Sequence, residues 1–401
     1  MTSIKPAPNG MGTFATRLAI FAMAVGSFGI GTGEFAIMGL LPNLAADLAI
    51  SEPHAGHVIS AYALGVVVGA PIFAIIFARA PRKPLMQALV AIFTLGHFAS
   101  AAAPDFWSLI ALRFASGLPH GAYFGIAALI AASMVDHGYR ARAVGRVMLG
   151  LTLATLLGMP LAAWFGQGWG WRPTFTGVGI IGMLTLAMII RFVPGVASGH
   201  RSSPLQEIGA LKRPQVWLTL GIAAAGCGGM FSVFTYVVPL LTEVTGVAVV
   251  WIPAILALFG IGMTLGNILG ASMADRSLMP TIGGMLVFNI ISLAILPWTA
   301  LYWPTACLSV LLVGFTAAIG TALQTRLMDV AADGQTLAAT LNHAAFNLAN
   351  ALGAFFGGLA ISAGWGWAST GPVGASMAIV GLMLFVVSVR LERRHKRAIA
   401  Y

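Results

Sequence analysis

The stretch GIGTGEFAIMGLLP (residues 29–42) places one carboxyl group, that of Glu34, inside a long apolar run. No Lys or Arg lies near Glu34 in the sequence. An ionisable side chain within a membrane span is costly and is by default a candidate functional group. The interpretation of Glu34 therefore depends on whether the surrounding segments cross a membrane.

The composition is that of a protein with many membrane spans. Of the 401 residues, 59% are hydrophobic and only 8% are charged, whereas soluble domains carry about 25% charged residues. Apolar runs of about 20 residues recur along the chain, as transmembrane helices require. A soluble protein with buried helices would need polar faces on its outer helices, and few segments have one.

The sequence predicts an all-α polytopic membrane protein with twelve transmembrane helices. The first six cover residues 17–42, 54–78, 84–103, 106–132, 143–165 and 171–193. The last six cover residues 215–241, 250–273, 281–302, 305–325, 335–363 and 369–390. We therefore expect two six-helix halves, 1–193 and 215–390, with a cytoplasmic central loop (194–214) and a basic cytoplasmic tail (391–401).

The distribution of basic residues predicts the orientation. Of the 21 Lys and Arg residues, 19 fall in the terminal segments or in alternate loops, and Arg172 is the one in the loops of the opposite side. Cytoplasmic loops are rich in Lys and Arg, so both termini are expected in the cytoplasm of a bacterial cell, with the chain in its inner membrane. The net charge of +10 then requires no nucleic acid as a partner.

Two observations indicate that the halves are repeats. The motif GWGW occurs at 168–171 and again at 364–367, an offset of 196 residues, and AR (78–79) and DR (275–276) are offset by 197. Small residues also recur every four positions in helices 2, 5, 8 and 11, which lets helix backbones approach closely. These ladders are Ala61, Gly65, Gly69; Gly150, Ala154, Gly158, Ala162, Gly166; Gly262, Gly266, Gly270, Ala274; and Ala345, Ala349, Gly353, Gly357.

Several motifs together carry a family resemblance. They are EFAIMGLLP in helix 1, GHVISAYALGVVVGAPI in helix 2, RFASGLPHGAYFG in helix 4, LLGMPLAAWFGQGWGWRPTF across helices 5 and 6, and NHAAFNLANALGAFFGG in helix 11. The chain resembles the major facilitator superfamily, its drug:proton antiporter branch, and within that branch the AraJ-type arabinose-efflux permeases. The resemblance implies a fold of two pseudo-symmetric halves that meet through helices 2, 5, 8 and 11, a contact that the ladders would serve.

The resemblance also implies residues that control the conformation. The loop between helices 2 and 3, AIIFARAPRK (74–83), keeps Arg79, Arg82 and Lys83 of the family motif but has Ala78 and Pro81 in place of its Asp and second Gly. The second half keeps Asp275 and Arg276. The helix 5 motif keeps Gly158 and Pro160, while Ala162 and Ala163 replace its following glycine pair.

Glu34 and Arg113 are predicted to share a cavity. At 1.5 Å per residue, Glu34 lies about 25 Å from the cytoplasmic end of helix 1, and Arg113 lies about 10 Å into helix 4 from the opposite side. In a core of about 30 Å these depths nearly coincide. Burial favours the neutral carboxyl and a nearby arginine favours the ionised one, so the pair could exchange a proton for a ligand. The alternative is a static ion pair that fixes helices 1 and 4.

His120 lies two turns deeper along helix 4, between Pro119 and Gly121. A histidine there could relay a proton or bind the substrate, and the Pro and Gly favour a bend that turns the side chain inward. The alternative is a neutral histidine hydrogen-bonded between helices.

Uncharged polar and aromatic side chains of the second half are candidates for substrate binding together with Glu34, Arg113 and His120. Such a lining suits a neutral or amphipathic small molecule. The alternative is hydrogen bonding between helices for the amides and lipid contact for the aromatics. The residues are Phe231, Phe234, Tyr236, Asn342, Phe346, Asn347 and Asn350.

The motifs of hydrolytic and metal enzymes are missing from the sequence, which has no HExxH, no GxSxG and no Cys-His cluster. We expect a secondary transporter rather than an enzyme, functional as a monomer, with the proton as coupling ion and no metal or other cofactor. The predicted activity is proton-coupled efflux of sugars or related small organic compounds by alternating access. A multidrug or nucleoside exporter is the alternative within this class, and an uncoupled facilitator, a membrane sensor or an intramembrane enzyme are the more distant ones.

Overall fold

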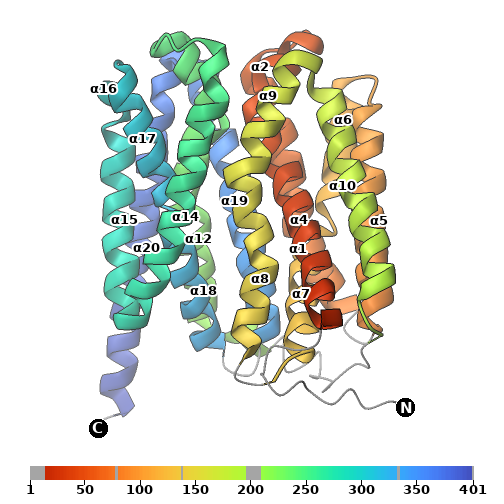
Figure 1. Ribbon diagram of the computed structural model, residues 1–401. Helices are drawn as coiled ribbons and strands as arrows, with labels where there is room; N and C mark the ends of the chain where they lie inside the picture. The colour runs from red at the N-terminus through yellow and green to blue at the C-terminus, as the bar shows by residue number, and fades with distance from the viewer. Residues whose placement is uncertain (1–13, 77–79, 137–138, 196–208, 332–334, 400–401) are drawn as a thin grey trace.

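The structure is a computed structural model that describes residues 14–76, 80–136, 139–195, 209–331 and 335–399. The secondary structure of these residues is helical (Figure 1). Eleven helical stretches are long and apolar enough to cross a membrane, and a shorter apolar helix, Leu278–Ala294, lies between the eighth and the ninth of them. The twelve predicted transmembrane helices and the all-α fold class are confirmed.

The first six spans form the N-terminal half. Their elements are α1 (Phe14–Phe35), η1 (Ala36–Leu40) and α2 (Leu41–Asp47); α3 (Glu52–Ala55) and α4 (His57–Ile76); α5 (Arg82–Ala101); α6 (Phe106–Gly117) and α7 (His120–Ser133); α8 (Arg140–Leu153), η3 (Ala154–Gly158) and α9 (Met159–Trp169); and α10 (Trp171–Phe192).

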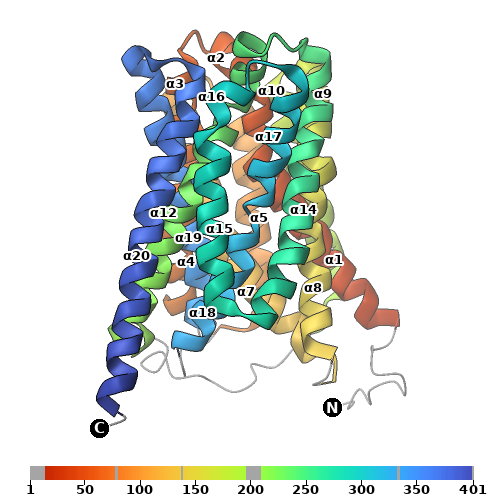
Figure 2. The ribbon, with the colours of Figure 1, turned by 90° about the vertical axis from the view of Figure 1, so that its left-hand side faces the viewer.

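The last six spans form the C-terminal half. Their elements are η4 (Ala210–Lys212), α12 (Pro214–Thr235), α13 (Val237–Pro239) and η5 (Leu240–Val244); η6 (Val249–Trp251) and α14 (Ile252–Arg276); α15 (Leu278–Ala294) and α16 (Leu296–Thr299); α17 (Trp303–Phe315) and α18 (Ala318–Ala331); α19 (Gln335–Ala360) and η8 (Ile361–Trp365); and η9 (Trp367–Ser369) and α20 (Thr370–Ile399). α20, α15 and α14 make the outer face of this half (Figure 2).

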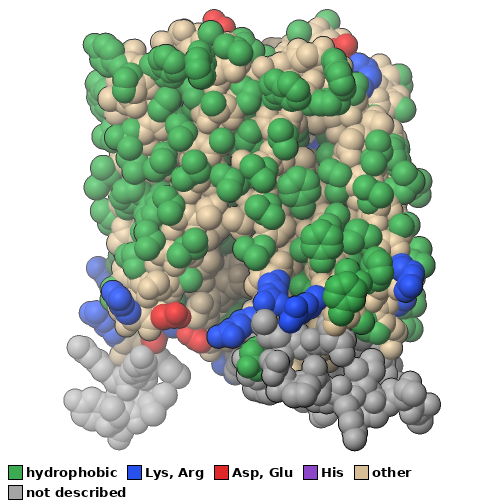
Figure 3. All heavy atoms as spheres, in the orientation of Figure 1, with side chains coloured by type: hydrophobic (Ala, Val, Ile, Leu, Met, Phe, Trp, Pro, Cys, Tyr) green, Lys and Arg blue, Asp and Glu red, His purple; other side chains and the backbone are tan. Residues whose placement is uncertain are grey.

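The surface matches a chain that spans a bilayer. Apolar side chains cover most of the height of the molecule, and Lys and Arg gather at the end where α1 begins and α20 ends (Figures 1 and 3). Exposed tryptophans mark helix ends at the opposite side, as expected of an aromatic belt at a membrane interface. They include Trp107, Trp169, Trp251, Trp298 and Trp365.

Corresponding spans of the two halves are interrupted in the same way. Span 4 breaks between α6 and α7, at the predicted bend beside Pro119, and span 10 breaks between α17 and α18. Span 1 loses its α-helical hydrogen bonding at Ala36, and span 7 loses it at Tyr236. The internal repeat inferred from the sequence is therefore visible in the architecture.

The small-residue ladders pack within each half, and the expectation that they join the two halves is wrong. A Cβ at Gly69 would lie 2.1 Å from the Leu118 carbonyl oxygen, which joins span 2 to span 4, and a Cβ at Gly266 would lie 2.4 Å from the Phe315 carbonyl oxygen, which joins span 8 to span 10. Gly150 likewise meets α1, and Gly353 meets α12. The same contacts recur in both halves: the pairing of spans 2 and 4 recurs in spans 8 and 10, and that of spans 1 and 5 recurs in spans 7 and 11. The close backbone approach therefore packs the interior of each half.

The halves meet through α4 with α19 and through α14 with η3 and α9, so helices 2, 5, 8 and 11 do form the contact, as the resemblance implied. At the tryptophan-marked end, Gly56 of the N-terminal half leaves room for the Tyr236 ring of the C-terminal half. Toward the opposite end the surface is recessed between the halves (Figure 3).

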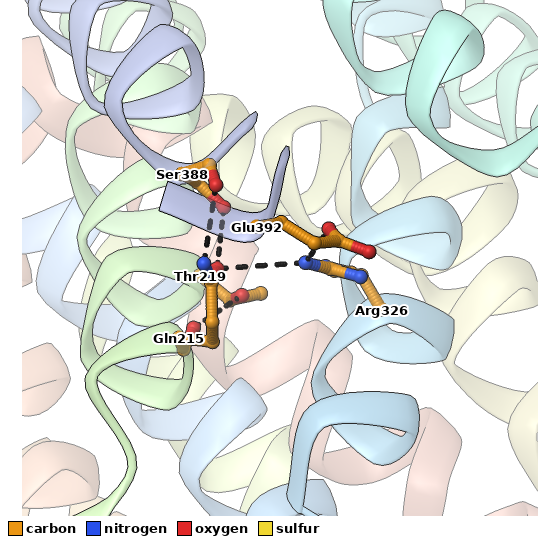
Figure 4. A network of polar contacts seen from close by, with 5 residues as sticks. All are labelled: Gln215, Thr219, Arg326, Ser388 and Glu392. Atoms are coloured by element: carbon orange, nitrogen blue, oxygen red, sulfur yellow. Dashed lines mark hydrogen bonds and ion pairs between the residues drawn. The ribbon is translucent and has the colours of Figure 1, made fainter. Parts of the chain in front are cut away.

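A polar network fastens the cytoplasmic end of the C-terminal half (Figure 4). Arg326 of α18 donates to Glu392 of α20 at 2.7 Å and to the Gln215 side-chain oxygen of α12 at 3.4 Å. Ser388 also donates to that oxygen, at 2.6 Å. The predicted boundaries stopped short of these contacts, because α18 continues to Ala331 and α20 continues through the predicted tail to Ile399.

Candidate functional site

Glu34 lies in the last turn of α1, directly before the interruption of span 1. Its side chain is 5% exposed, and it is the one buried acid among the residues whose burial the structure describes. The carboxyl lies beside Asn350 of α19 and within electrostatic reach of Arg113 of α6. Glu34 therefore touches both halves of the molecule.

Arg113 is fully buried and lies in a shell of mostly neutral groups. Its Nη2 donates to the Gly33 carbonyl at 3.1 Å, and its Nη1 lies 3.5 Å from Nε2 of His97. The guanidinium also lies over the ring of Tyr62, at 4.3 Å from the centroid, and at 5.1 Å from that of Phe175. A buried arginine keeps its charge, so these contacts must replace water.

Glu34 and Arg113 are neighbours without being an ion pair. The ion pairs between described residues are Arg172–Asp47 and Arg326–Glu392, so no Arg113 nitrogen comes within 4.0 Å of a Glu34 oxygen. The Nε of Arg113 has no hydrogen-bond partner. The two side chains lie close together, as the depths along the helices predicted, and no ion pair joins them in this conformation, while the shared cavity stays a prediction.

His120 continues the polar cluster toward the cytoplasm. It opens α7 directly after Pro119, and its Nδ1 shares a hydrogen bond of 3.1 Å with the Tyr62 hydroxyl. Its ring lies 6.4 Å from that of His343 on α19, which stacks on Phe124 at 5.1 Å. Because Tyr62 contacts both Arg113 and His120, it joins the two groups that the sequence singled out.

Of the three candidate amides of α19, Asn350 lies beside Glu34. Both polar atoms of the Asn350 side chain, and Oδ1 of Asn347, are buried without a hydrogen bond of good geometry. Asn347 donates to the His343 carbonyl at 3.1 Å, and Asn342 is 5% exposed. Buried amides without a well-formed hydrogen bond are costly in a folded protein, and at Asn350 the neighbouring polar group is the Glu34 carboxyl.

The aromatic candidates are engaged in helix packing. Tyr236 donates to the Ala354 carbonyl at 2.8 Å, and Phe234 stacks on Phe259 at 3.7 Å. Phe231 lies against Gly353, and Phe346 lies against Gly320. In this conformation the four side chains hold α12 and α19 to their neighbours.

The candidate gating residues lie at helix ends and at one helix irregularity. Arg79 lies outside the described residues. Arg82 opens α5, and Lys83 donates to the Ile190 carbonyl of α10 at 3.0 Å. Asp275 and Arg276 are exposed at the end of α14.

Gly158 ends the π-helical turn η3, and Pro160 lies in the first turn of α9. A Cβ at Gly158 would lie 2.2 Å from the Thr32 hydroxyl oxygen, so the irregular turn packs directly on α1.

Two members of the cluster were missed from the sequence, Tyr62 and His97. His97 is fully buried in the middle of α5. The signal was present, because a histidine within a membrane span is a candidate for function by the same rule that selected Glu34. Tyr62 gave no such signal, since tyrosine is common in membrane helices. No cluster of three or more His, Cys, Asp or Glu side chains suited to a metal ion occurs within the described part of the chain.

Membrane transport proteins are similar to this chain over almost its whole length. The chain is 40% identical over 374 residues to the inner membrane transport protein YdhP of Escherichia coli, covering 93% of this chain and 96% of that protein. It is 32% identical to the putative transporter AraJ of the same species (94% and 96% covered). A chloramphenicol resistance protein of Streptomyces lividans (30%; 92% and 95%) and a probable sugar efflux transporter of Pasteurella multocida (27%; 92% and 91%) are also similar.

Among solved structures, the fold resembles the inward-facing, unoccupied bacterial homologue of the human lysosomal transporter Spinster. The TM-score is 0.68 at 17% identity, and the match covers 94% of this chain and 96% of that one. The model of the Major Facilitator Superfamily matches residues 23–335. With its transmembrane helices, its two repeated halves and these relatives, the chain is a multi-pass inner-membrane protein that belongs to the Major Facilitator Superfamily of secondary transporters.

Proposed function

We propose that the protein is a proton-coupled exporter that exchanges external protons for internal sugars or related small organic compounds. The observation that carries the proposal is the position of Glu34, the buried acid that contacts both halves and lies beside Arg113 without pairing to it. A carboxyl in such a site has two stable arrangements. It is either neutral, as burial favours, or ionised and paired with the arginine.

These two arrangements provide the coupling. A proton that arrives from outside neutralises Glu34, and Arg113 then keeps its contacts with the uncharged groups around it. Release of the proton to the cytoplasm frees a carboxylate that draws Arg113 toward it and changes the contacts between α1, α6 and α19. Because Glu34 touches α19, the proton state of one side chain can bias the relative position of the halves, as alternating access requires. His120 and Tyr62 extend the polar cluster toward the cytoplasm and would pass the proton in that direction.

The substrate class is inferred from the unpartnered groups. Oδ1 of Asn347 has no hydrogen-bond partner, and the Asn350 amide faces Glu34 without a well-formed bond, which suits a neutral ligand rich in hydroxyl groups. The printed name of one relative, a probable sugar efflux transporter, supports this choice, and the resemblance to AraJ-type permeases agrees with it. The second candidate is a multidrug exporter, because another relative is a chloramphenicol resistance protein.

The proposal includes the way the molecule moves. Residues 1–193 and 215–390 would rock as two bodies about the contact made by α4, α19, α14 and α9, with the central loop 194–214 as their connection and 391–401 as a cytoplasmic tail. Each half would keep its own tight ladder contacts during this motion. A single copy contains both halves and the whole cluster, so we propose that the monomer is the functional unit.

The test is transport in proteoliposomes with L-arabinose, xylose, uridine, chloramphenicol and tetraphenylphosphonium as probes. An imposed pH gradient should drive accumulation of an accepted probe, and Glu34→Gln should abolish this driven accumulation while counterflow of the same probe continues. Asp105→Asn is the matched control, because Asp105 is an exposed helix cap and Asn caps equally well. Gradient-driven accumulation that survives in Glu34→Gln would refute the coupling role, and accepted probes indifferent to the gradient would indicate a facilitator.

A further inference from the structure

His97 occupies a position that the transport proposal does not use. It projects from α5 into the space between α1 and α6, where its ring is fully buried. A Cβ at Gly33 would lie 2.5 Å from Nε2 of His97. The glycine that precedes Glu34 therefore leaves the room that the imidazole ring occupies.

The hydrogen bonds of His97 determine where its proton lies. Nδ1 is 2.9 Å from the Phe93 carbonyl oxygen, which can only accept, so Nδ1 carries the hydrogen. Nε2 then presents its lone pair to Nη1 of Arg113 at 3.5 Å. Because the arginine remains charged and donates only, the contact requires a neutral imidazole in this one tautomer.

Arg113 is thereby held by acceptors that carry no charge. The Gly33 carbonyl and His97 Nε2 accept its hydrogens, and the faces of Tyr62 and Phe175 cover it. Neutral acceptors satisfy a guanidinium without cancelling its charge, so the arginine stays free to move to a carboxylate. The ionisable groups that act on Glu34 are Arg113 from α6 and Tyr62 from α4, and Asn350 faces it from α19.

We propose that His97 is a positioning residue that holds the Arg113 guanidinium on the Gly33 side of α1, away from Glu34, for as long as Glu34 carries its proton. The inference rests on the proposed role of Glu34 and adds the group that sets the resting place of its partner. Without an acceptor at position 97, Nη2 of Arg113 would still donate to the Gly33 carbonyl, but Nη1 would lose its partner and turn to the Glu34 carboxyl. The carboxyl would then give up its proton at a lower pH.

Infrared difference spectroscopy of the full chain in lipid tests this without any substrate. The C=O stretching band of a protonated carboxyl is followed against pH, and the part that Glu34→Gln removes belongs to Glu34. In His97→Phe, which keeps an aromatic ring and loses the acceptor, we expect the midpoint to fall by about one to three pH units, the effect of an opposite charge brought next to a carboxyl. His97→Gln, whose amide oxygen can accept from Arg113, should restore the wild-type midpoint.

Gly33→Ala is a second route to the same loss, since its Cβ would push the ring away from Arg113, and it replaces His97→Phe if that variant does not fold. A band whose midpoint is the same in wild type and in the acceptor-free variant would overturn the role of His97 and leave the role of Glu34 standing. A midpoint lowered equally in His97→Gln would also overturn it, because the acceptor would then be irrelevant. If the wild type has no titrating band that Glu34→Gln removes, both the proposed function and this inference fail.

Discussion

The ion pair between Arg326 and Glu392 should contribute more to stability than an ordinary surface pair. The Arg326 side chain is 10% exposed and that of Glu392 is 27% exposed, with the charged atoms 2.7 Å apart. At an effective dielectric constant of about 20 the Coulomb attraction is about 6 kcal/mol, most of which offsets the removal of both charges from water. Exposed pairs are worth up to about 1 kcal/mol, and breaking buried ones costs about 3–5 kcal/mol. We therefore expect about 2 kcal/mol for this half-buried pair.

The assay is a double-mutant cycle with Arg326→Gln and Glu392→Gln, with unfolding free energies measured in mixed micelles by titration with SDS. The pair Asp47–Arg172 is the matched control, because its side chains are 45% and 38% exposed, and it should give a coupling below about 1 kcal/mol. High salt should weaken the control more than the half-buried pair. A coupling energy for Arg326–Glu392 no larger than that of the control would refute the reasoning.

Two further predictions concern packing. Gly69→Leu should prevent accumulation of folded protein, since even its Cβ would lie 2.1 Å from the Leu118 carbonyl oxygen between α6 and α7. Gly284→Leu should be tolerated, because nothing lies within 4 Å of a Cβ at that position. The measurement is the amount of monodisperse protein on size exclusion, and equal amounts of the two variants would contradict the ladder argument. Asn289→Leu removes a buried 2.7 Å hydrogen bond to the Gly226 carbonyl and should cost about 0.6 to 1.7 kcal/mol in the same SDS titration, an effect that would be missing if the asparagine were unbonded in the membrane.

The features that could be predicted from the sequence are those that depend on the membrane alone. The lengths of the apolar runs predict the number of spans, and the positions of Lys and Arg predict that both termini lie on the same side of the membrane. Both predictions follow from the cost of polar groups in lipid. The bend at Pro119 was predictable for a local reason, since proline interrupts helical hydrogen bonding. The proximity of Glu34 and Arg113 followed from depth, which is a simple count of residues along each helix.

The remaining features depend on which helices are neighbours, and depth carries no such information. The ladders predict close approach but not its partner, and the contacts of Gly69 and Gly266 lie within the halves rather than between them. Arg326 lies one residue beyond the predicted helix 305–325, and its ion pair was not predictable because Glu392 lies 66 positions away in another span. The packing contacts of Phe234 and Tyr236 were not predictable, since aromatic rings that pack helices and rings that line a cavity look alike in a sequence.

The glycine contacts have a consequence for how mutations would reveal themselves in cells. A substitution in a ladder strikes the inside of a half and should change how much transporter survives quality control. A substitution where α14 meets η3 and α9 leaves both halves intact and should change the rate at which they exchange positions. The position of a substitution would thus decide whether protein abundance or turnover number changes. A survey of variants that measures both quantities could locate the boundary between the two moving halves from one conformation alone.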